Sequence, residues 1–165
     1  MKFDLKPLSA EAIPRALEKA ERYRLLNEPA EAESICLDVL HIEPDNQSAL
    51  VILLLAITDQ FPVRAAVRQA HDVLPRLRSE FDRTYYEGII CERRAKAHLS
   101  QGTPGCEAAA YDWFRRAMEC YEKAETLRQP ENDDATLRWN TCARILMANP
   151  RLASKTEERI ELPLE

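Results

Sequence analysis

The stretch that decides the fold is 13–46, with the sequence IPRALEKAERYRLLNEPAEAESICLDVLHIEPDN. Small and apolar residues recur in it at helical spacing on both sides of the turn 27–29. Adding 34 to the numbers of seven such residues gives an apolar residue again at six of the seven positions. The seven are Ala20, Tyr23, Ala32, Cys36, Val39, Leu40 and Pro44, and their counterparts are Leu54, Ile57, Ala66, Ala70, Val73, Leu74 and Arg78. This internal repeat predicts consecutive helix pairs that stack on each other.

The period and the residue types at its fixed positions resemble the tetratricopeptide repeat family. Members of that family place small residues at positions 8, 20 and 27, bulky residues at 11 and 24, and proline at 32. The first repeat has Ala20, Tyr23, Ala32, Cys36, Val39 and Pro44 at the matching places. Further along the chain, Ala117, Tyr121 and Ala124 repeat the spacing of positions 20, 24 and 27. The resemblance covers roughly residues 13–130 and implies a fold class more than a function.

The sequence therefore predicts an all-α superhelix made of three helix pairs, at about residues 13–46, 47–80 and 81–130. A capping helix at about 133–147 completes a single solenoid domain over residues 1–150, and 151–165 forms a charged tail. Local signals set the expected helix ends. We expect Ser9 to cap a helix near 10–26, Pro29 to open the next, and Asn46 or Asp45 to cap a helix near 47–59. A fourth helix starts at 61–62 and ends or kinks near Pro75.

The third pair departs from the repeat length. Ala66 and Ala117 are separated by 51 positions, or 34 plus 17, and the turn residues are confined to 100–105. Both helices are thus predicted to be longer than their neighbours and to form a projecting hairpin. Its expected contact residues are Arg94, Lys96, Trp113 and Arg116. They suit an acidic peptide or single-stranded nucleic acid, although aromatic residues at helical spacing favour packing inside the hairpin.

The resemblance implies that the first helix of each pair lines a concave, largely apolar groove that binds a partner. Tyr85 and Tyr86 are its expected anchors, because interface energy concentrates in such residues. The alternative is that the chain's own termini fill the groove. The predicted groove residues are Leu17, Glu21, Arg24, Val51, Ile52, Leu55, Tyr85, Tyr86, Ile89 and Arg93.

Composition and charge restrict the classes of function that we expect for this chain. A net charge of −5 disfavours nucleic acid and anionic membranes, and the strongest apolar run, 50–57, is too short to cross a bilayer. Five dispersed cysteines without a paired motif predict reduced thiols in the cytoplasm, with no metal and no cofactor. We expect a non-catalytic protein–protein interaction module that binds a protein or peptide and has the capacity to form a homo-oligomer. Catalysis by Cys91 with His98, or by Cys36 with His41, is the less favoured alternative.

Overall fold

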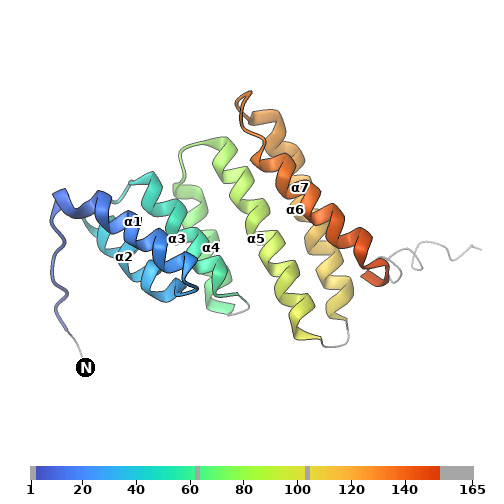
Figure 1. Cartoon of the computed structure of the whole chain (residues 1–165), viewed down its shortest axis with the longest axis horizontal. Coiled ribbons are helices and arrows are strands. Elements are labelled where there is room, and N and C mark those ends of the chain that lie inside the picture. Colours follow the sequence, from blue (N-terminus) through green and yellow to red (C-terminus); the bar gives the residue numbers. More distant parts are fainter. Residues whose placement is uncertain (1–2, 62–63, 103–104, 153–165) are drawn as a thin grey trace, which may run out of the picture. The chain divides into compact units, whose positions relative to one another are not determined.

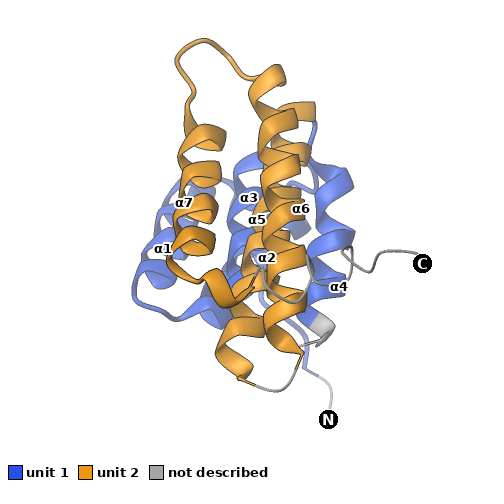
Figure 2. Ribbon diagram, turned by 90° about the vertical axis from the view of Figure 1, so that its right-hand side faces the viewer, with its two compact units in different colours: residues 1–78 blue, residues 79–165 orange. Residues whose placement is uncertain are grey.

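The described part of the chain is all-helical, as the sequence predicted. The computed structural model describes residues 3–61, 64–102 and 105–152, and every regular element within these ranges is helical (Figure 1). The elements belong to two compact units, residues 1–78 and 79–165 (Figure 2). The expected start of the fourth helix at Pro62 and most of the expected tail, 153–165, lie outside the described residues.

Unit 1 consists of four α-helices in which each helix packs against the next, and α1 also contacts α3. Its elements are α1 (Ile13–Leu25), α2 (Pro29–Ile42), α3 (Gln47–Asp59) and α4 (Arg64–Val73), with 3₁₀ turns at Ala10–Ala12 and Leu74–Arg76. The interior is built around α3, where Leu50 and Leu54 have no exposed surface. Ala20 and Ala32 are also fully buried, so small residues let α1 and α2 approach closely.

Most of the predicted helix ends in unit 1 agree with the structure. Pro29 occupies the first turn of α2, where a missing N–H costs nothing, and the Asn46 side chain accepts a hydrogen bond of 2.9 Å from the Ala49 backbone N–H. The α4 helix ends at Val73, and Pro75 lies in the 3₁₀ turn that follows. Ser9 occupies the expected N-cap position, because the 3₁₀ turn Ala10–Ala12 runs directly into α1, but its side chain makes no capping hydrogen bond.

Unit 2 is a long helical hairpin with a third helix beside it. Its elements are α5 (Glu80–Gln101), α6 (Cys106–Leu127), α7 (Asp134–Ala148) and the 3₁₀ turn Pro150–Leu152. The predicted lengthening is confirmed, because α5 and α6 have 22 residues each whereas α3 has 13. The Ser79 side chain caps α5 by accepting from the Asp82 backbone N–H at 3.2 Å, and Gly102 ends it in a left-handed conformation.

The hairpin helices approach each other closely at Gly88. A Cβ atom at this position would lie 2.5 Å from Cε1 of Tyr121, which is itself fully buried. Only glycine therefore leaves room for this ring. A small residue on α5 and a bulky one on α6 therefore fit together at this point.

Candidate functional site

A buried carboxylate joins the three helices of unit 2. Glu92, on α5, is only 1% exposed. Its carboxylate accepts a hydrogen bond from the Tyr121 hydroxyl of α6 at 2.7 Å, and it binds the Lys96 ammonium at 2.5 Å and the Arg138 guanidinium of α7 at 3.4 Å. A buried charge is tolerated only when it is paired and hydrogen-bonded in this way. We call Glu92, Lys96, Tyr121 and Arg138 the Glu92 cluster.

The surroundings of the Glu92 cluster raise the pKa values of two of its members, Tyr121 and Arg138. Burial raises the pKa of Tyr121, and the negative charge of Glu92 raises it further, so the hydroxyl stays protonated and donates. Burial alone would lower the pKa of Arg138, but Glu92 and the bonded Tyr85 hydroxyl together raise it. The cluster therefore holds α7 against the hairpin.

The Glu92 cluster was not predicted from the sequence. Arg138 of α7 points toward Glu92 of α5 and is half-buried. A signal for Glu92 was present in the sequence. It occupies the same helical stripe as Gly88 and Ala95, which are buried, so its periodic position is that of a core residue.

A second cluster involves the predicted hairpin contact residues. The guanidinium carbon of Arg94 lies 3.5 Å from the centre of the Trp113 ring, and that of Arg116 lies 4.8 Å from it. Arg116 is exposed, and the other two are partly exposed. We call Arg94, Trp113 and Arg116 the arginine–tryptophan surface. Lys96 does not belong to it, because its ammonium is bound to Glu92.

The arginine–tryptophan surface and the Glu92 cluster lie on different sides of the hairpin. Residues two apart on an α-helix point about 200° away from each other, so Arg94 faces away from the direction of Glu92. Because α7 covers the side of Glu92, it leaves the arginine–tryptophan surface uncovered within unit 2.

Two thiols lie next to this surface. A hydrogen bond from the Cys120 thiol of α6 lowers the pKa of Cys91 on α5, with smaller contributions from Arg94 and Arg116. The same contact and burial raise the pKa of Cys120. Cys91 is thus paired with another thiol, whereas the catalytic hypothesis paired it with His98. In unit 1, burial raises the pKa of Cys36 to about 12, so this thiol is protonated at neutral pH.

The groove residues predicted in unit 1 are mostly accessible. Leu17, Val51 and Leu55 are partly exposed, and Glu21 is exposed. Ile52 is 5% exposed, so its placement in a groove was wrong: it belongs to the core of α3. Arg24 forms an ion pair with Asp59 at 2.8 Å, which ties α1 to α3.

The groove residues predicted in unit 2 divide in the same way. Tyr86 and Arg93 are partly exposed, but Ile89 is 1% exposed, so it is a core residue and was wrongly placed in a groove. Tyr85 is already engaged by neighbours. Its ring lies 5.7 Å from that of Phe81 and 5.9 Å from that of Tyr121. It acts as a packing residue between α5, α6 and α7 more than as an open anchor.

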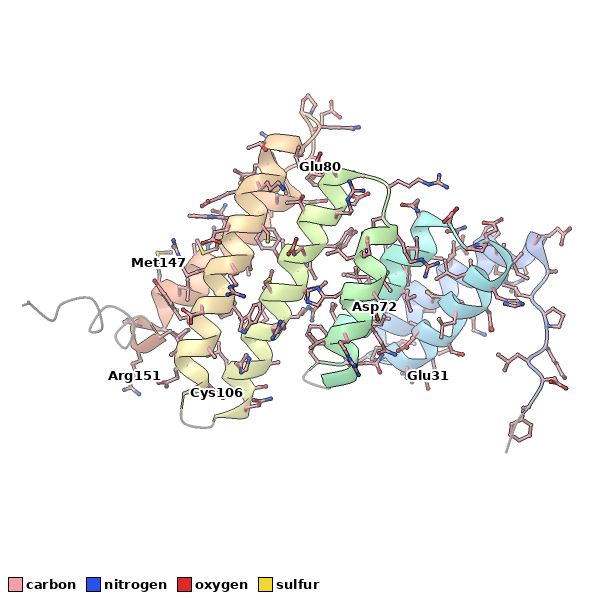
Figure 3. The ribbon with its side chains drawn as sticks, turned by 180° about the vertical axis from the view of Figure 1, so that it is seen from behind. Glu31, Asp72, Glu80, Cys106, Met147 and Arg151 are labelled. Atoms are coloured by element: carbon pink, nitrogen blue, oxygen red, sulfur yellow. The ribbon has the colours of Figure 1, made fainter. Side chains whose placement is uncertain are left out.

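The end of the hairpin borders an open cleft of about 570 Å³. Residues that follow α7 lie beside the end of the hairpin in unit 2. Ala148–Leu152 line this cleft together with Gly102 and Gly105, and Leu152 is buried. Figure 3 shows Cys106 and Arg151, both in its lining, at the same end of the unit.

Within the described ranges, no group of three or more His, Cys, Asp or Glu side chains is arranged to hold a metal ion. None of the described helices combines the length and apolar character needed to cross a membrane.

No protein-family model matches the chain, and no curated protein or solved structure matches it. The resemblance to tetratricopeptide repeats therefore stays a prediction, and a function has to be argued from the surfaces described above.

Proposed function

We propose that this protein is a non-catalytic protein–protein interaction module of tetratricopeptide-like design, whose stacked helix pairs hold a segment of a partner polypeptide. The observation that carries the proposal is the accessible apolar strip formed by Leu17, Val51 and Leu55 on two neighbouring helices of unit 1. Apolar strips with a charged border are typical of contact sites.

The geometry of α1 and α3 supports a continuous surface. The Arg24–Asp59 ion pair joins residues 35 apart in the sequence, so α1 and α3 run side by side with nearly the repeat offset. The same offset, continued along both helices, would place Leu17 beside Val51 and Glu21 beside Leu55. We call Leu17, Glu21, Arg24, Val51, Leu55 and Asp59 the α1–α3 face. It would bind a segment that carries apolar side chains and a basic group opposite Glu21.

The decisive experiment compares two leucines of unit 1. Leu55→Glu places a charge in the α1–α3 face, whereas Leu37→Glu makes the same change on α2, where Leu37 is 53% exposed. Proteins that bind the tagged wild type in cells are identified, and their affinities for both purified variants are measured. We expect Leu55→Glu to weaken a genuine partner at least tenfold and Leu37→Glu to leave it within about twofold. Retention of every partner by a folded Leu55→Glu protein would remove the α1–α3 face from the proposal.

The proposal extends to location and assembly. Free thiols at all five cysteines support a reducing compartment, which we propose is the cytoplasm. A partner that is a second copy of the chain would appear as a doubled mass in light scattering, and this mass would return to that of one chain in Leu55→Glu.

A further inference from the structure

The arginine–tryptophan surface carries two guanidinium groups with no acidic partner. Among the residues that the structure describes, neither Arg94 nor Arg116 forms an ion pair with a carboxylate; each contacts the ring of Trp113 instead. Two other basic groups of this unit, Lys96 and Arg138, are instead paired with Glu92. Unit 2 therefore leaves this pair of charges uncompensated.

The two arginines also repel each other. Burial lowers the pKa of Arg94; among its charged neighbours Cys91 raises this pKa, and the positive charge of Arg116 lowers it by a smaller amount. An anionic group placed between them relieves this repulsion. A guanidinium that lies flat on a ring keeps its N–H donors at its edge, where they bind a carboxylate through two parallel hydrogen bonds. Both guanidinium groups lie over the Trp113 ring, with their central carbons 3.5 Å and 4.8 Å from its centre.

Nucleic acid fits the same surface less well. Single-stranded nucleic acid is held by stacking bases on exposed aromatic faces and by neutralising many phosphates. The Trp113 ring is already covered by the Arg94 guanidinium at 3.5 Å, and the chain as a whole carries a net charge of −5. An acidic polypeptide needs only the edge donors of the two arginines, which remain available.

We propose that the arginine–tryptophan surface binds an acidic segment of a partner polypeptide, with one carboxylate on Arg94 and a second on Arg116. This inference rests on the proposed function and adds to it a second contact, of opposite character to the apolar α1–α3 face. Glutamate or aspartate pairs in the partner segment supply the two carboxylates. Binding weakens as the salt concentration rises, because the contact is electrostatic.

The experiment uses the full chain and a fluorescein-labelled peptide of alternating glutamate pairs and glycines. A peptide with glutamine in place of glutamate is its control. The variant R94Q/R116Q removes both proposed contacts. Its matched control, R115Q/R144Q, removes two exposed arginines and causes the same change in net charge. In a Trp139→Phe background, the emission of Trp113 reports whether the peptide lies at this site. Circular dichroism checks that each variant is folded.

We expect the glutamate peptide to shift the Trp113 emission and to bind at least about tenfold more weakly to R94Q/R116Q than to wild type. The affinities of R115Q/R144Q and Leu55→Glu for the glutamate peptide should stay within about threefold of that of the wild type. If Leu55→Glu still binds the glutamate peptide, the two proposals are separated. The role of the α1–α3 face can then be confirmed or rejected without affecting that of the arginine–tryptophan surface.

Four results would overturn the inference. The first is a lack of binding by the wild type, or an equal loss in R115Q/R144Q. The second is tighter binding of an oligothymidylate that depends on Arg94 and Arg116, which would assign the surface to nucleic acid. The third is a gain in affinity when the glutamates of 153–165 are replaced by glutamine, which would make the chain's own tail the occupant. The fourth is a doubled light-scattering mass that R94Q/R116Q abolishes, which would assign the surface to a second copy.

Discussion

The interiors of unit 1 and unit 2 depend on different chemistry. Around α3 the buried side chains are almost all apolar, and the one polar exception within this helix, Thr58, bonds to the Leu55 carbonyl of its own helix at 2.8 Å. In unit 2 a buried carboxylate, Glu92, bonds to groups on its own helix and on two others. The interior around α3 is stabilised by buried apolar area and by packing alone. The interior of unit 2 also depends on the orientation of its hydrogen bonds and ion pairs.

This difference shows what each interior specifies. Apolar packing tolerates exchanges that keep volume, because any well-filled arrangement has nearly the same free energy. A buried ion cluster is satisfied in one arrangement only, and losing one member leaves the others unpaired. We infer that packing sets the stability of unit 1, while the Glu92 cluster also selects the position of α7.

The largest effect is expected in the apolar interior. Leu54 has no exposed surface, so Leu54→Ala leaves a cavity and lowers the free energy of unfolding of unit 1 by about 3–5 kcal/mol. Leu54→Met, which keeps the volume, costs less than about 1.5 kcal/mol. Urea denaturation measures both, and alkylation of the buried Cys36 thiol reports on unit 1 directly. A loss below about 1 kcal/mol for Leu54→Ala would show that this interior is not tightly packed.

The second largest effect is expected in the interior of unit 2, at Glu92. Glu92→Gln keeps the shape but removes the charge, and it lowers the free energy of unfolding by about 2–3 kcal/mol, because bonds to a charged group are lost. Alkylation of Cys142, which is fully buried in unit 2, should accelerate roughly 30- to 150-fold.

The matched control for this prediction is Glu119→Gln on the exposed side of α6, which should stay within about 0.5 kcal/mol. A double mutant with Arg138→Gln should cost less than the sum of the two single changes, since both remove the same contact. Additive costs would mean that Glu92 and Arg138 do not act together.

The same contrast separates what the sequence could predict from what it could not. Periodicity and capping are local, so the bounds of α3, Gln47–Asp59, were predicted correctly from Asn46 and the apolar spacing. The long hairpin followed from the 51 positions between Ala66 and Ala117. These predictions needed no knowledge of which helices meet in space.

The errors arose where distant helices meet. Glu92 and Arg138 are 46 residues apart, and each alone has the appearance of a solvated charge. Their pairing depends on how α7 lies against α5, and this arrangement cannot be read from residue composition. Ile52 and Ile89 were assigned to a groove by family position, yet both are buried. The stacking of Arg94 on Trp113 likewise joins two helices, although both residues had been singled out as contact residues.

A smaller effect tests how tightly the hairpin of unit 2 is packed. In an open helix, Gly→Ala stabilises by up to about 1 kcal/mol. At Gly88 the added methyl group would overlap the buried Tyr121 ring, so Gly88→Ala should instead destabilise by about 1–2 kcal/mol. Thermal unfolding gives the sign, with Glu87→Ala on the exposed side as the control. A stabilising Gly88→Ala would mean that Tyr121 moves freely, which the hydrogen bond to Glu92 opposes.

The smallest effect compares the two units at alkaline pH. Burial raises the pKa of Cys36 in unit 1 to about 12, and burial together with the charge of Glu92 raises that of Cys142 in unit 2 to about 12. An ordinary thiol loses its proton near pH 9, so above that pH the unfolded chain binds fewer protons than the folded one. The stability that these thiols contribute is fully present below pH 9 and is lost as pH rises toward 12.

From pH 9 to pH 10 each thiol should lower the free energy of unfolding by about 1 kcal/mol, and Cys36→Ala or Cys142→Ala should remove one such contribution. Urea denaturation at both pH values measures the slope, and the change in packing cancels because it is the same at each pH. The Glu92→Gln change should reduce the alkaline slope due to Cys142 and leave that due to Cys36 unchanged, because only Cys142 is close to the Glu92 charge. An equal effect of Glu92→Gln on both thiols would show that the two interiors are not electrostatically distinct.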